Sequence, residues 1–182
     1  MTDGNSGTLA RRETMSLTLK ERLSLKKNQP VLLLDVSGSM ALTIEIGHRR
    51  IDALREIVRQ FNSPKIAFSD SAKVVVDVPA PSGGTYMSKA IDLAKSLGHK
   101  SGVIITDGAN SSSDEQAALS AVKDFALQII YVGVGEAPAF LHKLAAKGCG
   151  FCTVENLKNP KQLTEKIQLL LNPGNERKDI IL

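Results

Sequence analysis

Three short segments of the chain combine glycine with side chains that carry oxygen atoms. They are Asp35-Val36-Ser37-Gly38-Ser39, Ser82-Gly83-Gly84-Thr85 and Thr106-Asp107-Gly108. In the first segment the alternate spacing allows all three polar side chains to lie on one side of an extended backbone. The candidate ligands in these segments supply two carboxylates (Asp35 and Asp107) and three hydroxyl groups (Ser37, Ser39 and Thr85), without histidine or cysteine. Hard oxygen ligands of this kind suit Mg²⁺ or Mn²⁺ rather than Zn²⁺ or Cu²⁺.

The charge balance of these side chains indicates what such a metal would do. Two carboxylates only neutralise a divalent cation, and neutral hydroxyl groups leave the cation electrophilic. Mg²⁺ prefers six oxygen ligands and commonly retains waters, one of which a carboxylate from another molecule can replace. The sequence therefore predicts a metal-bridged docking site, with these candidate metal ligands: Asp35, Ser37, Ser39, Thr85 and Asp107.

Strand and helix patterns alternate from Pro30 onward and place these segments. Continuous or alternating apolar runs predict strands at 31–36, 65–68, 72–76, 102–106, 126–132 and 151–154. Helical spacing and helix-ending residues predict helices at 50–61, 87–97, 114–125, 137–147 and 160–171. This alternation predicts a doubly wound α/β fold, in which helices cover both faces of a mostly parallel sheet. Such sheets bind ligands beyond the carboxyl ends of their strands.

The polar residues in this order resemble the metal-ion-dependent adhesion site (MIDAS) of von Willebrand factor A domains. The resemblance rests on Asp35-x-Ser37-x-Ser39, on Thr85 after two glycines and on Asp107, and its context extends over 29–171. It implies a six-stranded sheet with one antiparallel edge strand. It also implies that the serines bind the metal directly, that Thr85 does so when a ligand is engaged, and that the two aspartates bind directly or through water.

The resemblance implies a metal-dependent protein–protein interaction module without catalysis of its own. A partner's Asp or Glu would complete the coordination, and the expected partner is an AAA+ ATPase or another component of the same complex. The alternative is a Mg²⁺-dependent hydrolase or phosphotransferase with Asp35 as nucleophile. That chemistry needs a second carboxylate or a lysine nearby, and Lys89 and Asp70 are the candidates.

Residues around the metal ligands are candidates for a rim that contacts the partner: Met40, Tyr86, Met87, Asn110 and Ser111. Met87 fits a core position equally well. The run from Ser111 to Asp114 is also expected to cap the helix that follows it. His48, beside Arg49 and Arg50, fits either the rim of the site or a solvated helix start, and the second interpretation is favoured.

Length and charge set the domain organisation. The 182 residues suffice for one domain, which we expect at 29–171, with a basic arm at 1–28 and a tail at 172–182. The arm carries six basic and three acidic residues, whereas the rest carries seventeen and sixteen. A nearly neutral body with few aromatic residues disfavours nucleic-acid binding. Without a membrane-length apolar run or a secretory signal, we expect a cytoplasmic protein.

Two further features leave alternatives open. The basic arm itself is a second candidate for the main partner contact. The Cys149-x-x-Cys152 pair lies in the turn into the last predicted strand rather than at a helix start. Structural packing is therefore favoured over a redox pair, or over half of a zinc site with His142.

Overall fold

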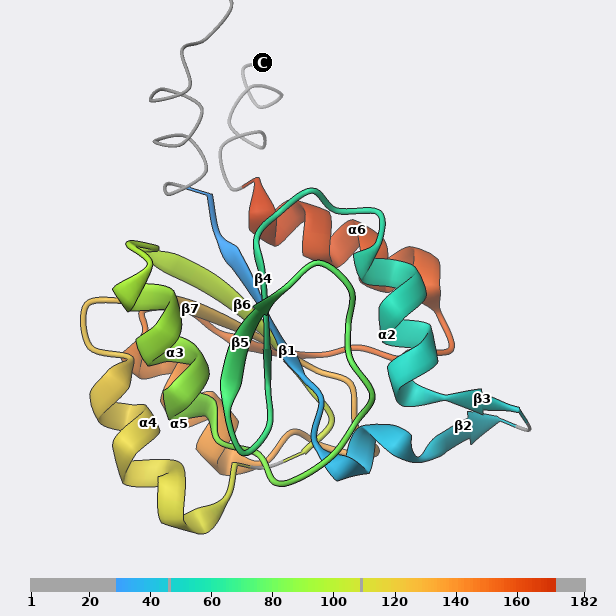
Figure 1. Cartoon of the computed structure of the whole chain (residues 1–182), viewed down its shortest axis with the longest axis horizontal. Helices are drawn as coiled ribbons and strands as arrows, with labels where there is room; N and C mark the ends of the chain where they lie inside the picture. Colours follow the sequence, from blue (N-terminus) through green and yellow to red (C-terminus); the bar gives the residue numbers. More distant parts are fainter. Residues whose placement is uncertain (1–28, 46, 109, 173–182) are drawn as a thin grey trace, which may run out of the picture.

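The computed structural model describes residues 29–45, 47–108 and 110–172 (Figure 1). The predictions for the arm at 1–28 and for the tail beyond residue 172 lie outside the described residues.

A six-stranded sheet forms the centre of the molecule, in the strand order β5-β4-β1-β6-β7-β8. The edge strand β5 runs antiparallel to β4, and every other pairing is parallel. The predicted mixed sheet with one antiparallel edge strand is confirmed. The strand bounds are β1 (Val31–Asp35), β4 (Lys65–Phe68), β5 (Ala72–Val75), β6 (Ser101–Thr106), β7 (Ala126–Tyr131) and β8 (Cys152–Val154).

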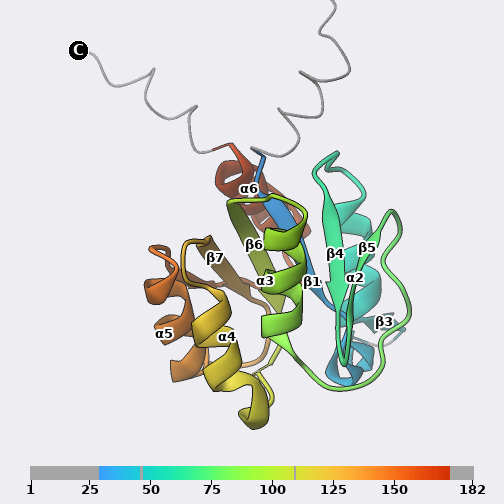
Figure 2. The same ribbon diagram turned by 60° about the vertical axis from the view of Figure 1, so that its left-hand side comes forward.

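Helices cover both faces of this sheet, as a doubly wound fold requires (Figure 2). One face packs against α3 (Met87–Ser96), α4 (Glu115–Ala121) and α5 (Ala139–Lys147). The other packs against α2 (Arg50–Val58) and α6 (Pro160–Leu171). Strand β1 lies between both layers, so its alternate side chains enter opposite cores and all five residues are buried.

A small two-stranded ribbon was not predicted. It pairs β2 (Thr43–Glu45) with β3 (His48–Arg49) in antiparallel register, and the short 3₁₀ helix η1 (Gly38–Ala41) precedes it. The ribbon leads directly into α2, because β3 ends at Arg49 and the helix begins at Arg50. Arg50 N also donates a hydrogen bond to Leu42 O, just before β2, at 3.0 Å. The ribbon therefore brings the first residue of α2 back toward the end of β1.

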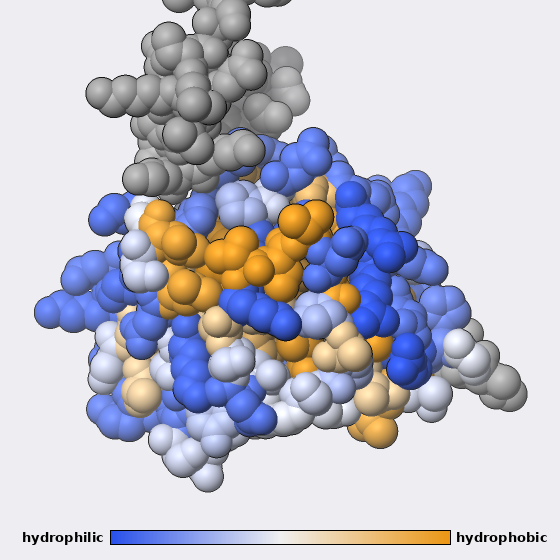
Figure 3. All heavy atoms as spheres, viewed as in Figure 1, coloured by the Kyte–Doolittle hydropathy of each residue, from blue (hydrophilic) through white to orange (hydrophobic). Residues whose placement is uncertain are grey.

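The free edge of the sheet carries exposed apolar side chains. Val74 of β5 is 60% exposed, and Val76, just after the strand, is 88% exposed. Figure 3 shows hydrophobic residues gathered in the upper half of the face on which β5 lies. Among the residues that the structure describes, no helix combines the length and the apolar character needed to cross a membrane.

Candidate functional site

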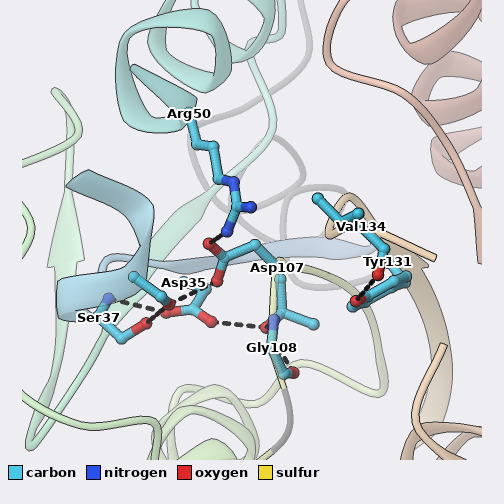
Figure 4. A network of polar contacts seen from close by, with 9 residues as sticks. Asp35, Ser37, Arg50, Asp107, Gly108, Tyr131 and Val134 are labelled. Carbon is cyan, nitrogen blue, oxygen red and sulfur yellow. Dashed lines mark hydrogen bonds and ion pairs between the residues drawn. The ribbon is translucent and has the colours of Figure 1, made fainter. Parts of the chain in front are cut away.

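Asp35 is the last residue of β1, and its side chain is fully buried. Its carboxylate accepts hydrogen bonds from Ser37 N at 2.8 Å and from Thr106 Oγ1 at 2.6 Å (Figure 4). Burial raises the pKa of Asp35 from 3.8 to about 6, although these hydrogen bonds oppose the shift. The ionised carboxylate is therefore poorly compensated by its surroundings and would gain from a bound cation.

The two serines connect Asp35 to the neighbouring strand β6. Ser37 Oγ lies 3.1 Å from Ser39 Oγ, and Ser39 Oγ donates to Asp107 Oδ1 at 2.7 Å. Because β1 and β6 are adjacent parallel strands, their carboxyl ends meet at one edge of the sheet. Four of the five predicted metal ligands thus lie in one connected network.

Thr85, the fifth predicted ligand, is buried at the same edge in a separate loop. Gly38 N donates to Gly83 O at 2.9 Å, which holds this loop against the one that carries the serines. Gly83 has a φ of +76°, and a Cβ atom there would overlap the Asp70 carboxylate. The described hydrogen bonds place the Thr85 loop beside the network but do not link the Thr85 hydroxyl to the other four ligands.

Arg50 supplies a positive charge to the network. Its Nη1 forms an ion pair with Asp107 Oδ2; the Arg50 side chain is 14% exposed and the Asp107 side chain is fully buried. His48 and Arg49 are exposed, as the favoured interpretation expected, but they form strand β3. Arg50 does begin the helix, but it is largely buried and not solvated. Arg50 lies four residues before the buried Leu54, so helical spacing was the available signal.

Three of the five predicted rim residues are buried instead. Met40, within η1, and Met87, the first residue of α3, are fully buried, one in each of the two cores. Asn110 is also buried, and its Oδ1 accepts a hydrogen bond from Met87 N at 3.0 Å. Tyr86 and Ser111 remain half-buried. The predicted rim is therefore corrected to these two residues.

The predicted cap at Ser111 to Asp114 serves a different helix. Buried Asp114 accepts hydrogen bonds from Ser88 N at 3.0 Å and from the Ser88 hydroxyl, so it caps α3 rather than α4. The 3₁₀ helix η2 (Ser112–Asp114) precedes α4 and accounts for this difference. Ser111 Oγ also accepts from Thr85 N at 3.3 Å, which connects this segment to the Thr85 loop.

A hollow of about 570 Å³ opens beside Arg50. The ends of β7 and β8 and the β2 strand line it, with Thr43, Val134, Glu155 and Lys158 among the residues. The loop after β7 is closed by Tyr131 Oη, which donates to Val134 O at 3.1 Å (Figure 4). The hollow provides space for a ligand group next to the guanidinium of Arg50.

The donor set fits a small, hard divalent cation. It consists of two carboxylates and neighbouring hydroxyl groups. Within residues 29–45, 47–108 and 110–172, no group of three or more His, Cys, Asp or Glu side chains is placed to hold a metal. Any metal at this edge therefore depends on the serine and threonine oxygens.

The two residues considered for catalysis are engaged with each other. Lys89 Nζ donates to Asp70 O and lies 4.6 Å from the centre of the Tyr86 ring. The Asp70 carboxylate accepts from Gly84 N at 2.8 Å. These contacts give both residues a structural role in the Thr85 loop.

Cys149 lies in the turn after α5 and Cys152 begins β8, so the pair spans the turn into the last strand as predicted, and both are free thiols. Cys149 is exposed with a φ of +56°, and Cys152 packs against the core formed by α3, α4 and α5. Burial raises the pKa of Cys152 to about 11. A thiol protonated at neutral pH favours the packing interpretation.

A search of solved structures finds a von Willebrand factor type A protein from Catenulispora acidiphila. The TM-score is 0.60 and the sequence identity 16%, and the match covers 78% of this chain and 42% of that one. The chain thus spans less than half of that protein's length. No family model and no curated protein sequence matches this chain. The structural match and the sheet topology show that this chain has the fold of a von Willebrand factor A domain.

Proposed function

We propose that this chain is a metal-dependent protein-binding module. Mg²⁺ or Mn²⁺ would be held by Asp35, Ser37, Ser39, Thr85 and Asp107, and an Asp or Glu of a partner protein would complete the coordination. The observation that carries the proposal is the hydrogen-bonded network that joins four of these ligands at the ends of β1 and β6. The proposed setting is a cytoplasmic multiprotein assembly, with an AAA+ ATPase as one candidate for the acidic partner.

The residues of the network have different roles in the proposed metal site. Thr106 and the backbone of Ser37 orient the Asp35 carboxylate through its two oxygens. Ser37 and Ser39 carry hydroxyl oxygens whose lone pairs can turn toward a cation when their present hydrogen bonds are released. A bound metal would supply an open coordination position for a carboxylate.

Binding is favoured over catalysis by the side chains around Asp35. A phosphoryl-transfer nucleophile needs positive charge where negative charge develops. Lys89 is instead occupied at Asp70 and Tyr86. Arg50 pairs with Asp107 and makes no described contact with Asp35, the residue that would act as nucleophile.

Affinity capture from the native lysate tests the proposal. It compares Mg²⁺ with EDTA, and wild type with the Ser37→Ala/Ser39→Ala variant. The matched control is Ser96→Ala/Ser120→Ala, which removes two exposed hydroxyl groups at other positions on α3 and α4. A partner captured only with Mg²⁺, by wild type and control alike, supports the metal bridge. The same partner captured in EDTA by the Ser37/Ser39 variant rejects it, and phosphatase turnover lost in Asp35→Asn would establish the enzymatic alternative.

A further inference from the structure

Arg50 provides a resident positive charge beside the candidate metal site. Its guanidinium pairs with Asp107 Oδ2 while Ser39 Oγ donates to Asp107 Oδ1, so both oxygens of this buried carboxylate are satisfied without a metal. Figure 4 shows Arg50 reaching from α2 toward Asp107, with Asp35 and Ser37 on the far side of that carboxylate. The pair is largely shielded from water, because Arg50 is 14% exposed and Asp107 is fully buried at the side chain. Charges so placed interact strongly.

The formal charges around the network set the conditions for metal binding. Ionised Asp35 and Asp107 together with Arg50 give a net charge of −1. A divalent cation changes this charge to +1, and one carboxylate from a ligand would bring it to zero. The guanidinium therefore repels the metal and attracts the anion that follows it.

We propose that Arg50 makes metal binding at this site depend on an anionic ligand. The proposal rests on the proposed function and concerns the regulation of the same site. Without metal, Arg50 keeps Asp107 paired and the site assembled. With metal alone, the excess positive charge weakens binding. A carboxylate ligand at the metal removes that excess, so metal and ligand bind cooperatively.

Substitutions at Arg50 separate this role from a merely structural one. Arg50→Gln removes the charge, and we expect its Mg²⁺ affinity to rise about tenfold, because a unit charge is lost a few ångströms from the metal. The metal-free variant melts at a lower temperature, since Asp107 loses its partner. Arg50→Lys retains the charge and keeps an affinity close to wild type. The control is Arg49→Gln, whose side chain pairs with Asp52 in an exposed position, and it leaves the Mg²⁺ affinity unchanged.

The probes are Mg²⁺ alone and Mg²⁺ with acetate, and the full chain is measured by calorimetry and by thermal melting. Acetate replaces chloride at constant ionic strength. Wild type should bind Mg²⁺ several-fold more tightly in acetate, and Arg50→Gln should show a smaller gain. If Arg50→Gln does not fold, Arg50→Met, which also removes the charge but keeps much of the apolar side chain, takes its place in the same comparison.

The outcomes separate this inference from the function on which it rests. An Arg50→Gln variant with lower stability but unchanged or weaker Mg²⁺ affinity overturns the inference. A wild type that binds Mg²⁺ equally tightly in acetate and in chloride also overturns it. The inference is also overturned if the Mg²⁺ affinity rises as much in Arg50→Lys as in Arg50→Gln, because the charge of residue 50 would then not be the cause. If wild type and every Arg50 variant fail to bind Mg²⁺, the proposed metal site itself is rejected.

Discussion

Replacing Asp35 by asparagine should stabilise the metal-free protein at neutral pH. The side chain is fully buried, and burial raises its pKa from 3.8 to about 6. Asparagine keeps the size of the side chain, and its Oδ1 can still accept from Ser37 N. Its amide can donate to Thr106 Oγ1, whose own proton can turn to Gly108 O at 3.2 Å. The substitution therefore removes the charge while the local hydrogen bonds are rearranged.

The magnitude follows from the pKa shift. An acid whose pKa is raised on folding contributes most stability below its unfolded pKa, and this contribution is lost as the pH rises through the folded pKa. A shift from 3.8 to about 6 corresponds to about 3 kcal/mol at about 1.4 kcal/mol per pH unit. We expect the variant and wild type to be equally stable near pH 4 and to differ by up to about 3 kcal/mol above pH 7. That difference corresponds to about 6–12 °C in melting temperature for a chain of this length.

Chemical and thermal unfolding in EDTA across this pH range measure the difference, and a second series contains Mg²⁺. Wild type should gain stability from Mg²⁺ and Asp35→Asn should not. In Mg²⁺ the difference in free energy of unfolding between the two proteins should therefore become smaller or change sign. Asp92→Asn, an exposed position on α3, is the matched control and should show neither effect. An Asp35→Asn variant less stable than wild type in EDTA at pH 8 would refute the reasoning, because the ionised carboxylate would then be a net stabiliser.

Three other changes test separate parts of the structure. Gly133→Ala should lower the free energy of unfolding in urea by about 3 kcal/mol, because a Cβ would overlap the Tyr131 ring and the Asp107 carbonyl. The control Gly135→Ala, with open space around it and a φ of +78°, should lower it by about 1 kcal/mol. Equal losses of stability in the two variants would contradict the close packing at Gly133. Asp114→Ala should cost about 3 kcal/mol by the same measurement, because Ser88 keeps two buried donors without an acceptor. In native protein at pH 7.5, iodoacetamide should modify Cys149 well before Cys152, whose pKa is raised to about 11 by burial; peptide mass mapping showing Cys152 modified first would be inconsistent with its packing.

The strands and helices were predictable because their apolar spacing is local. The run from Val31 to Asp35 contains no polar residue before its last position, which is typical of a strand buried on both faces. The helix at 160–171 was predicted with its observed bounds, since Pro160 marks its start. The observed ends of helices differed from the predicted ones where a helix closes in a 3₁₀ turn. They also differed where a short 3₁₀ helix precedes the helix, as at Asp114.

The sequence predicted the site only for residues that the order of the strands brings together. Asp35 ends β1 and Asp107 follows β6, the adjacent parallel strand, so topology brings them together. Thr106 and Arg50 escaped prediction because their partners lie 71 and 57 residues away in the chain. Local spacing does not reveal which side chain meets a buried carboxylate. The same limit explains Asn110, whose amide accepts from a backbone nitrogen 23 residues away instead of facing a partner.

The hydrogen bonds of the network also bear on what a metal can add. Asp35, Ser37, Ser39 and Asp107 are already held together by bonds of 2.6–3.1 Å, together with those from Thr106. Arg50 supplies the charge that would otherwise be missing at Asp107. A site assembled in this way does not need a metal in order to form, so the free energy of metal binding is available for attracting a carboxylate rather than for ordering loops. The selectivity of the module would then lie in charge and coordination at the ends of β1 and β6, and the fold itself would remain the same with and without the ion.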